Sequence, residues 1–207
     1  MLAKFYIKFI VFVYYSLIRE FNKALQFHLQ KRIGKCGTNT RINFTNSTFC
    51  GVENFEFGSN VYIPHGATFY STNAKLIIGD NVMFGPNPTI ITGDHRTNVI
   101  GVPMCDVHEK LPENDLDVCI DDEVWCGANV TILKGVTIGR GSIVAACSLV
   151  SRSAPPYSII AGVPAKFIKF RFNVDEILQH EAVIYPMEKR LSKEKLEELF
   201  SKYHRGM

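Results

Sequence analysis

The sequence is short of the features that mark several common classes of protein. It has one tryptophan, a net charge of only +3 and no Gly-X-Y period, which excludes collagen and gives no support for nucleic-acid binding. It also lacks an uninterrupted apolar run of the roughly 20 residues that a membrane-spanning helix needs. The content of 46% apolar and 12% aromatic residues excludes a disordered chain, and 207 residues are enough to bury the core of one domain.

Metal sites and disulfides find little support in the sequence. Six cysteines are present, but no two form a C-x-x-C pair, and no cysteines and histidines have the spacing of a structural zinc site. A chain of this length does not need disulfides to stabilise its core. We therefore expect reduced thiols, a cytoplasmic protein and no metal.

The N-terminal segment, residues 1–32, is expected to be an amphipathic helix. It carries six Lys/Arg against one acid, and Phe9–Ile18 is a run of ten uncharged residues flanked by Lys8 and Arg19. Ten residues are half of a bilayer span. Two interpretations stay open: the helix packs on its own oligomer, or residues 1–30 lie peripherally on the inner face of the membrane.

A period of six dominates the middle of the chain. From residue 120 onward, an apolar residue recurs at every sixth position: Ile120, Cys126, Ile132, Ile138, Val144 and Val150. Small or β-branched residues follow four places later: Val124, Val130, Val136, Ser142, Ser148 and Ala154. Six fits neither the helical nor the strand period, but it fits one short strand plus a turn, repeated three times per coil. The pattern predicts an all-β solenoid, a parallel β-helix.

Residues 120–170 carry more specific motifs. They include V-W-C-G at 124–127, G-V-T-I-G at 135–139 and A-G-V-P-A-K at 161–166, and G-D-H-R-T-N precedes them at 93–98. With these motifs the chain resembles the hexapeptide-repeat acyltransferases, in the branch of xenobiotic and polysaccharide O-acetyltransferases, over about residues 55–190. The resemblance implies a left-handed coil, a homotrimer with active sites between subunits, and acetyl-CoA as co-substrate.

The six-residue register is interrupted for about 24 residues, which predicts an extended loop at about 93–117. The resemblance places the catalytic base on His95, at the start of this loop. Imidazole suits the task, because it accepts a proton near neutral pH. We expect His65 to pack or to face solvent, and His108 at most to line the acceptor side.

The resemblance also implies a set of residues around the donor. Trp125 would form a wall of the pantetheine or acceptor pocket, and the backbone N–H of Ala128 would bind the thioester carbonyl. Further members are small residues beside the pantetheine arm and cations near the CoA phosphates: Ala145, Ala146, Arg152, Lys166 and Lys169. Trp125 has a packing role as its alternative, and the three cations are also ordinary surface residues.

Asn87 matches a polar position before the loop and is expected to contact the acceptor, with a corner hydrogen bond as the alternative. The β pattern ends near residue 172, so the β-helix domain is assigned to 33–172 and a helical extension to 173–207. Asn173 with Glu176 predicts a helix cap there. This extension either caps its own solenoid or packs on a neighbouring subunit.

These features predict an O-acetyltransferase that moves an acetyl group from acetyl-CoA to a hydroxyl, most plausibly on a sugar of a surface polysaccharide or its precursor. Acetylation of a xenobiotic or antibiotic is the alternative within the enzyme class. Two other classes are weaker. A zinc lyase on the same solenoid needs converging histidines that the sequence does not space closely, and a non-enzymatic scaffold leaves the His95 motif and Trp125 unexplained.

Overall fold

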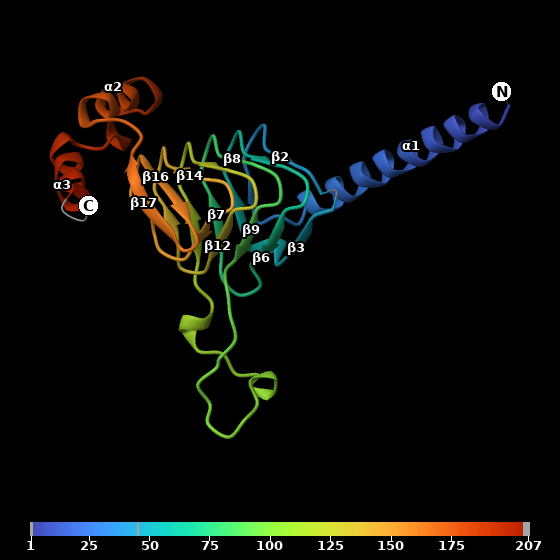
Figure 1. Ribbon diagram of the computed structural model, residues 1–207, viewed down its shortest axis with the longest axis horizontal. Coiled ribbons are helices and arrows are strands. Elements are labelled where there is room, and N and C mark those ends of the chain that lie inside the picture. Colours follow the sequence, from blue (N-terminus) through green and yellow to red (C-terminus); the bar gives the residue numbers. More distant parts are fainter. Residues whose placement is uncertain (1, 45, 205–207) are drawn as a thin grey trace.

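The computed structural model describes residues 2–44 and 46–204. A β-helix forms the body of the molecule, with α1 (Leu2–Gln30) at one end and α2 (Val174–Ile184) and α3 (Lys193–His204) at the other (Figure 1). The β-helix is built from short parallel strands, as the period of six predicts, and helices precede and follow it.

Each coil contributes one strand to each of three sheets. Sheet A contains β1 (Lys35–Cys36), β4 (Phe55–Phe57), β7 (Leu76–Ile78), β10 (Val118–Ile120) and β13 (Thr137–Ile138). Sheet B contains β2 (Arg41–Ile42), β5 (Tyr62–Ile63), β8 (Met83–Phe84), β11 (Trp125–Cys126), β14 (Ile143–Val144), β16 (Ser158–Gly162) and the antiparallel β17 (Ala165–Phe170). Sheet C contains β3 (Thr48–Cys50), β6 (Thr68–Tyr70), β9 (Thr89–Ile91), β12 (Thr131–Leu133) and β15 (Leu149–Val150).

The core is the continuous interior of the coils. All six apolar positions of the period, from Ile120 to Val150, are buried to 1% exposure or less, and the small residues that follow them are buried as well. Aromatic residues fill the first coils instead, where Phe55, Phe57 and Phe69 pack against one another. Stacking therefore buries a face that no single coil could bury alone.

The corners between strands are held by asparagines in the left-handed conformation. At the corner between sheets A and B, Asn39, Asn60 and Asn81 have φ of 55°, 58° and 59°. Asn39 Nδ2 donates to Asn60 Oδ1 at 2.8 Å, and Asn60 Nδ2 donates to Asn81 Oδ1 at 3.0 Å. Asparagine tolerates this backbone better than most residues, and its amide can bond to the layer above.

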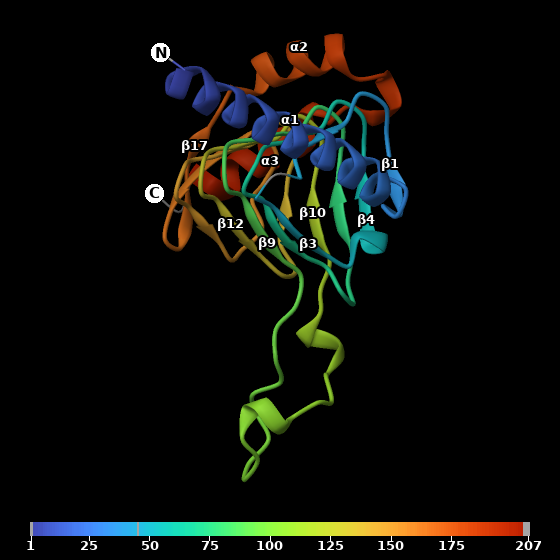
Figure 2. The ribbon, with the colours of Figure 1, turned by 90° about the vertical axis from the view of Figure 1, so that its right-hand side faces the viewer.

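The interruption of the register forms a long loop that projects from the coil between β9 and β10 (Figures 1 and 2). Its two ends are paired with each other. The Asp94 N–H donates to the Asn114 carbonyl at 2.8 Å, and the Leu116 N–H donates to the Thr92 carbonyl at 2.9 Å. The loop thus leaves the β-helix through a closed neck, and the sheets continue above and below it without a change of register.

The C-terminal helices close the last coil of their own chain. Asn173 caps α2 as predicted, since its Oδ1 accepts from the Glu176 N–H at 2.9 Å and Glu176 Oε2 accepts from the Asn173 N–H at 2.8 Å. Tyr157, Ile177 and Leu196 form a second buried cluster. Within it the Tyr157 hydroxyl donates to the carboxylate of buried Glu181 at 3.0 Å.

Candidate active site

His95 lies at the corner where the chain leaves sheet C for sheet A, immediately after the neck of the loop. Its side chain is exposed and lines a groove of about 570 Å³. The other lining residues come from β6, β9 and the loop: Tyr70, Thr72, Ile91, Gly93, Asp94, Lys110 and Asp115. The groove combines an aromatic ring, charged groups and an imidazole, and its size suits a small polar molecule.

The residue before His95 is fixed from two sides. Asp94 Oδ1 accepts from Asn114 Nδ2 at 2.7 Å, and Asp94 Oδ2 pairs with Lys134 Nζ at 2.7 Å. Lys134 follows β12, in the next coil, and it also donates to the Glu113 carbonyl. Hydrogen bonds from Lys134 and Asn114 lower the pKa of Asp94, which keeps the carboxylate ionised.

The far side of the groove is also held by charged and amide groups. Asp115 accepts from Lys110 Nζ at 2.8 Å and from Asn73 Nδ2 at 3.1 Å. Asn73 lies 42 residues before Asp115, in the preceding coil. The groove is therefore a cross-coil structure, which the loop and two successive coils build together.

The predicted alanines gather at a different corner, between sheets B and C. Gly127 fits there because an added Cβ would lie 2.6 Å from the backbone nitrogen of Ala146 in the next coil. The Cys147 N–H donates to the Ala128 carbonyl at 2.8 Å, and the Ala145 N–H donates to the Ile160 carbonyl at 2.9 Å. The small side chains leave backbone accessible along this corner, since Ala146 is exposed and Ala128 is partly exposed.

Trp125 and Lys169 share one outward column of sheet B. The strand pairing runs from Trp125 to Ile143, from Ile143 to Ile159, and from Ile159 to Lys169. Neighbouring strands lie about 4.8 Å apart, so the backbone positions of Trp125 and Lys169 are on one face, about 15 Å apart. Lys166 is on the same β17 strand and is exposed.

The two remaining predicted residues, Arg152 and Asn87, lie at different corners. Arg152 follows β15 and lies beside Lys134 in the corner column that begins at Thr92, with an exposed side chain. Asn87 lies at the alanine corner with φ of 57°, and its Nδ2 donates to Asn129 Oδ1 at 3.1 Å. It does not line the groove of His95; its place is that of a corner residue.

Within one chain, the alanine corner and His95 therefore lie at opposite edges of sheet C, with Arg152 on the His95 side. The sequence did not point to Tyr70, Lys110, Asp115 or Lys134 as neighbours of His95. Asp115 and Lys110 belong to a loop without a period, so no spacing rule places them.

The described residues of the site do not provide the side chains of a metal centre. In the part of the chain that the structure describes, no three His, Cys, Asp or Glu side chains come close enough to hold a metal ion. His65 and His108, the two other histidines considered from the sequence, are exposed, and neither lines the groove of His95.

The chain is similar in sequence to several known proteins. No protein-family model matches the chain. A galactoside O-acetyltransferase of Lactococcus lactis is 31% identical over 145 residues, which are 70% of this chain and 66% of that protein. The chain spans between about half and two thirds of the length of the curated relatives it matches.

Two solved structures extend the match to the fold. A galactoside acetyltransferase in complex with coenzyme A superposes with a TM-score of 0.61 at 26% identity, covering 86% of this chain and 85% of the other. A hexapeptide-repeat acetyltransferase of Vibrio cholerae, complexed with acetyl-CoA, superposes with a TM-score of 0.58 at 25% identity, covering 73% and 79%.

Proposed function

Because this chain belongs to the hexapeptide-repeat acetyltransferase family, we propose that it transfers an acetyl group from acetyl-CoA to a hydroxyl of a saccharide acceptor. The observation that carries the proposal is the position of His95, exposed in a polar groove at the neck of the loop. The sugar substrates named for the relatives, and the Tyr70 ring in the groove, support a saccharide over an apolar drug.

Acetyl transfer requires one proton to move from the acceptor hydroxyl to His95 and from there to the sulfur of CoA. A ring nitrogen of His95 takes the proton of the acceptor hydroxyl as its oxygen attacks the thioester carbonyl carbon. The new C–O bond forms, the C–S bond breaks, and the imidazolium returns the proton to the thiolate of CoA. The Ala128 N–H would stabilise the oxyanion between these steps, and such a donor contributes about 2.7–4 kcal/mol to the transition state.

We further propose that the active site is completed between subunits of a homotrimer with left-handed coils. His95 and the alanine corner lie at opposite edges of sheet C in one chain, so a neighbouring copy would bring the two edges together. Sheet B supports this assembly with an outward column of Tyr62, Met83 and Trp125, each about half exposed. Large apolar side chains on a flat sheet face mark a surface that another subunit covers.

The proposed donor site uses that same face. Pantetheine would lie along the alanine corner beside Trp125, and the exposed cations Lys166 and Lys169 would meet the phosphates of CoA. Arg152, on the His95 corner, would approach the phosphates from the neighbouring subunit. Because the donor is a metabolite of the cell interior, we place the reaction in the cytoplasm. A surface polysaccharide or its precursor is the acceptor we propose.

Release of CoA thiol from acetyl-CoA tests the proposal, with a panel of free sugars, oligosaccharides and chloramphenicol as acceptors. We expect release with a saccharide, and a loss of turnover of about 10²–10⁴-fold in His95→Ala. His108→Ala, in the same loop but outside the groove, is the matched control and should retain wild-type turnover. Equal turnover of His95→Ala and wild type would refute the assignment, and release with chloramphenicol alone would favour the xenobiotic reaction.

A further inference from the structure

Helix α1 makes much less contact with the β-helix than its length allows. It extends away from the first coil, with its N-terminus far from the body (Figure 1). Among the side chains of α1 that the structure describes, Leu25 and Leu29 pack on the core, and Ile18, Asn22 and Gln26 are half-buried at the edge. The described side chains of residues 6–15 are all exposed, so they are available for another contact.

The unpacked part of α1 carries a wide apolar face. Residues at i, i+4, i+7, i+11 and i+15 fall on one side of a helix. On α1 these are all apolar or aromatic, with exposed fractions between 37% and 68%: Tyr6, Ile10, Val13, Leu17 and Phe21. Phe9 and Tyr14 flank this row on its two sides and are 57% and 59% exposed. Such a contiguous apolar surface is normally covered in a native protein.

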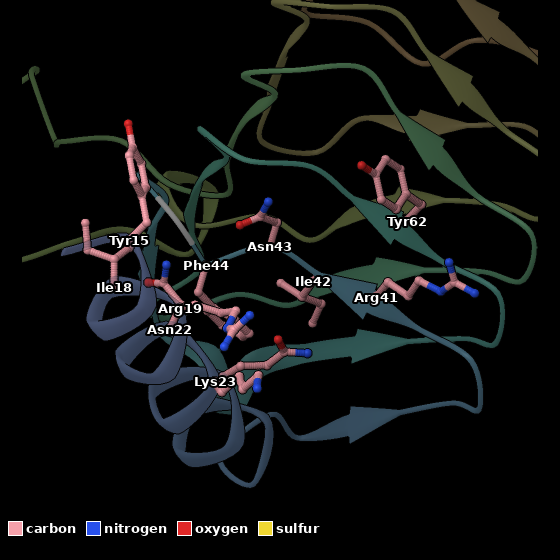
Figure 3. Close-up of a pocket in the computed structure, with 11 residues that line it drawn as sticks. Tyr15, Ile18, Arg19, Asn22, Lys23, Arg41, Ile42, Asn43, Phe44 and Tyr62 are labelled. Carbon is pink, nitrogen blue, oxygen red and sulfur yellow. The ribbon is translucent and has the colours of Figure 1, made fainter. Parts of the chain in front are cut away.

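The opposite side of α1 is basic. Lys8, Arg19 and Lys23 follow the same helical spacing on that side, with Phe12 and Tyr15 between them, and no acidic residue occurs before Glu20. A groove of about 610 Å³ separates this part of the helix from the first strands, with Tyr15, Arg19 and Lys23 on the helix wall (Figure 3). Arg41 and Tyr62 line the other wall and add a further cation.

We propose that α1 lies flat on an anionic lipid bilayer, with its apolar face in the acyl region and its basic side among the headgroups. A large apolar face opposite a Lys/Arg-rich face is the pattern of helices that lie in the membrane interface. No helix in the described part of the chain is long and apolar enough to cross a bilayer. Pairing of α1 with a second copy of itself would need only a narrow apolar stripe. It would not explain why the charged side of the helix carries cations.

The proposal is independent of the reaction, because it rests on α1 alone and not on His95 or the donor site. It does have a consequence for the reaction. A chain held on the bilayer by α1 keeps the β-helix close to the surface, where acceptors attached to a lipid are concentrated. The test therefore measures lipid binding directly, and thiol release on the same preparations reports separately on catalysis.

Co-sedimentation of the full chain with vesicles tests the proposal. We expect binding to vesicles of phosphatidylcholine mixed with phosphatidylglycerol, and much weaker binding to phosphatidylcholine alone. Ile10→Ser with Leu17→Ser should weaken binding to the mixed vesicles by about tenfold or more. The matched control is Val183→Ser with Met187→Ser, two exposed apolar residues near the other end of the molecule, which should bind like wild type.

A second pair of variants tests the charge. Arg19→Gln with Lys23→Gln should weaken binding to the anionic vesicles by about 25-fold, since each cation near an anionic surface contributes about fivefold. Lys195→Gln with Lys202→Gln on α3 is the control of equal charge. Equal binding of wild type and the Arg19/Lys23 variant would overturn the electrostatic part of the proposal.

The alternative is that a second copy of the chain covers the apolar face of α1. Size-exclusion chromatography distinguishes this subunit contact from lipid binding. If wild type binds neither vesicle, and Ile10→Ser with Leu17→Ser changes the oligomeric state, the proposal is wrong and α1 is a subunit contact. Both variants alter exposed side chains of the helix, so the melting temperature should stay that of wild type.

Discussion

The ammonium group of Lys134 lies 2.7 Å from the carboxylate of Asp94, the residue immediately before His95. Lys134 follows β12, one coil above, so this ion pair joins the neck of the loop to the next layer of the β-helix. The side chain of Lys134 is only 24% exposed, and it also donates to the Glu113 carbonyl on the returning part of the loop. Lys134 therefore positions the backbone that carries the proposed base.

Lys134→Gln should lower kcat by between about 10- and 100-fold, because small displacements of a catalytic group have effects of this size. The KM for acetyl-CoA should stay unchanged, since the proposed pantetheine corner of Ala128, Ala145 and Ala146 lies at the opposite edge of sheet C. Lys134→Arg keeps the cation and should restore part of the rate. Lys75→Gln, which removes an ion pair with Glu56 away from the groove, is the control. A rise in KM without a change in kcat would contradict the positioning role.

Tyr157→Phe should lower the free energy of unfolding by about 1.5–3 kcal/mol, the contribution typical of a hydrogen bond to a charged group. The Tyr157 hydroxyl donates to buried Glu181, and burial raises its pKa, so it stays protonated through the neutral range. Urea denaturation measures the effect. Tyr6→Phe removes an exposed hydroxyl and should change stability by less than about 0.5 kcal/mol. Equal urea midpoints for Tyr157→Phe and Tyr6→Phe would contradict a stabilising role of the Tyr157–Glu181 hydrogen bond.

Replacing Asn60 by alanine should destabilise the protein more than replacing it by glycine. Asn60→Ala loses two side-chain hydrogen bonds and places alanine at φ of 58°, so we expect a loss of about 2 kcal/mol in the free energy of unfolding. Asn60→Gly loses the bonds but tolerates the backbone, and should lose about 1 kcal/mol. Thermal or urea unfolding of both variants tests the order, and a less stable glycine variant would contradict it.

The cysteines should differ strongly in reactivity. Cys126 is fully buried and burial raises its pKa to about 12, so at pH 8 about one thiol in ten thousand would be ionised. Cys105 and Cys147 are exposed. Native protein treated with iodoacetamide at pH 8 should be alkylated at these two positions first, and at Cys126 only after denaturation. Peptide mass mapping identifies the sites; rapid native labelling of Cys126 would contradict the packing of the core.

The period of six was enough to predict the core, because a stacked fold repeats its buried positions at fixed intervals. It identified every inward position from Ile120 to Val150, and all are buried. The corner ladders were not predicted. Asn39, Asn60 and Asn81 recur at intervals of 21 rather than 18 residues, so they fall outside the hexapeptide count.

The surroundings of His95 were beyond prediction for a related reason. The loop lengthens one coil, so that partners in adjacent layers are 42 residues apart, as for Asn73 with Asp115 and for Asn87 with Asn129. No local spacing rule reaches so far along the chain. The motif placed His95 in sequence, whereas the groove around it depends on which layer the returning loop meets.

The paired neck of the loop makes the stretch between residues 96 and 113, beyond His95, an interchangeable cassette. The coils above and below keep their register whatever hangs from the neck, because residues 92–94 are already paired with residues 114–116. The entropic cost of a longer loop grows only with the logarithm of its length. Substrate choice can therefore diverge among descendants of this chain by exchange of the cassette, while the scaffold and its stability are inherited unchanged.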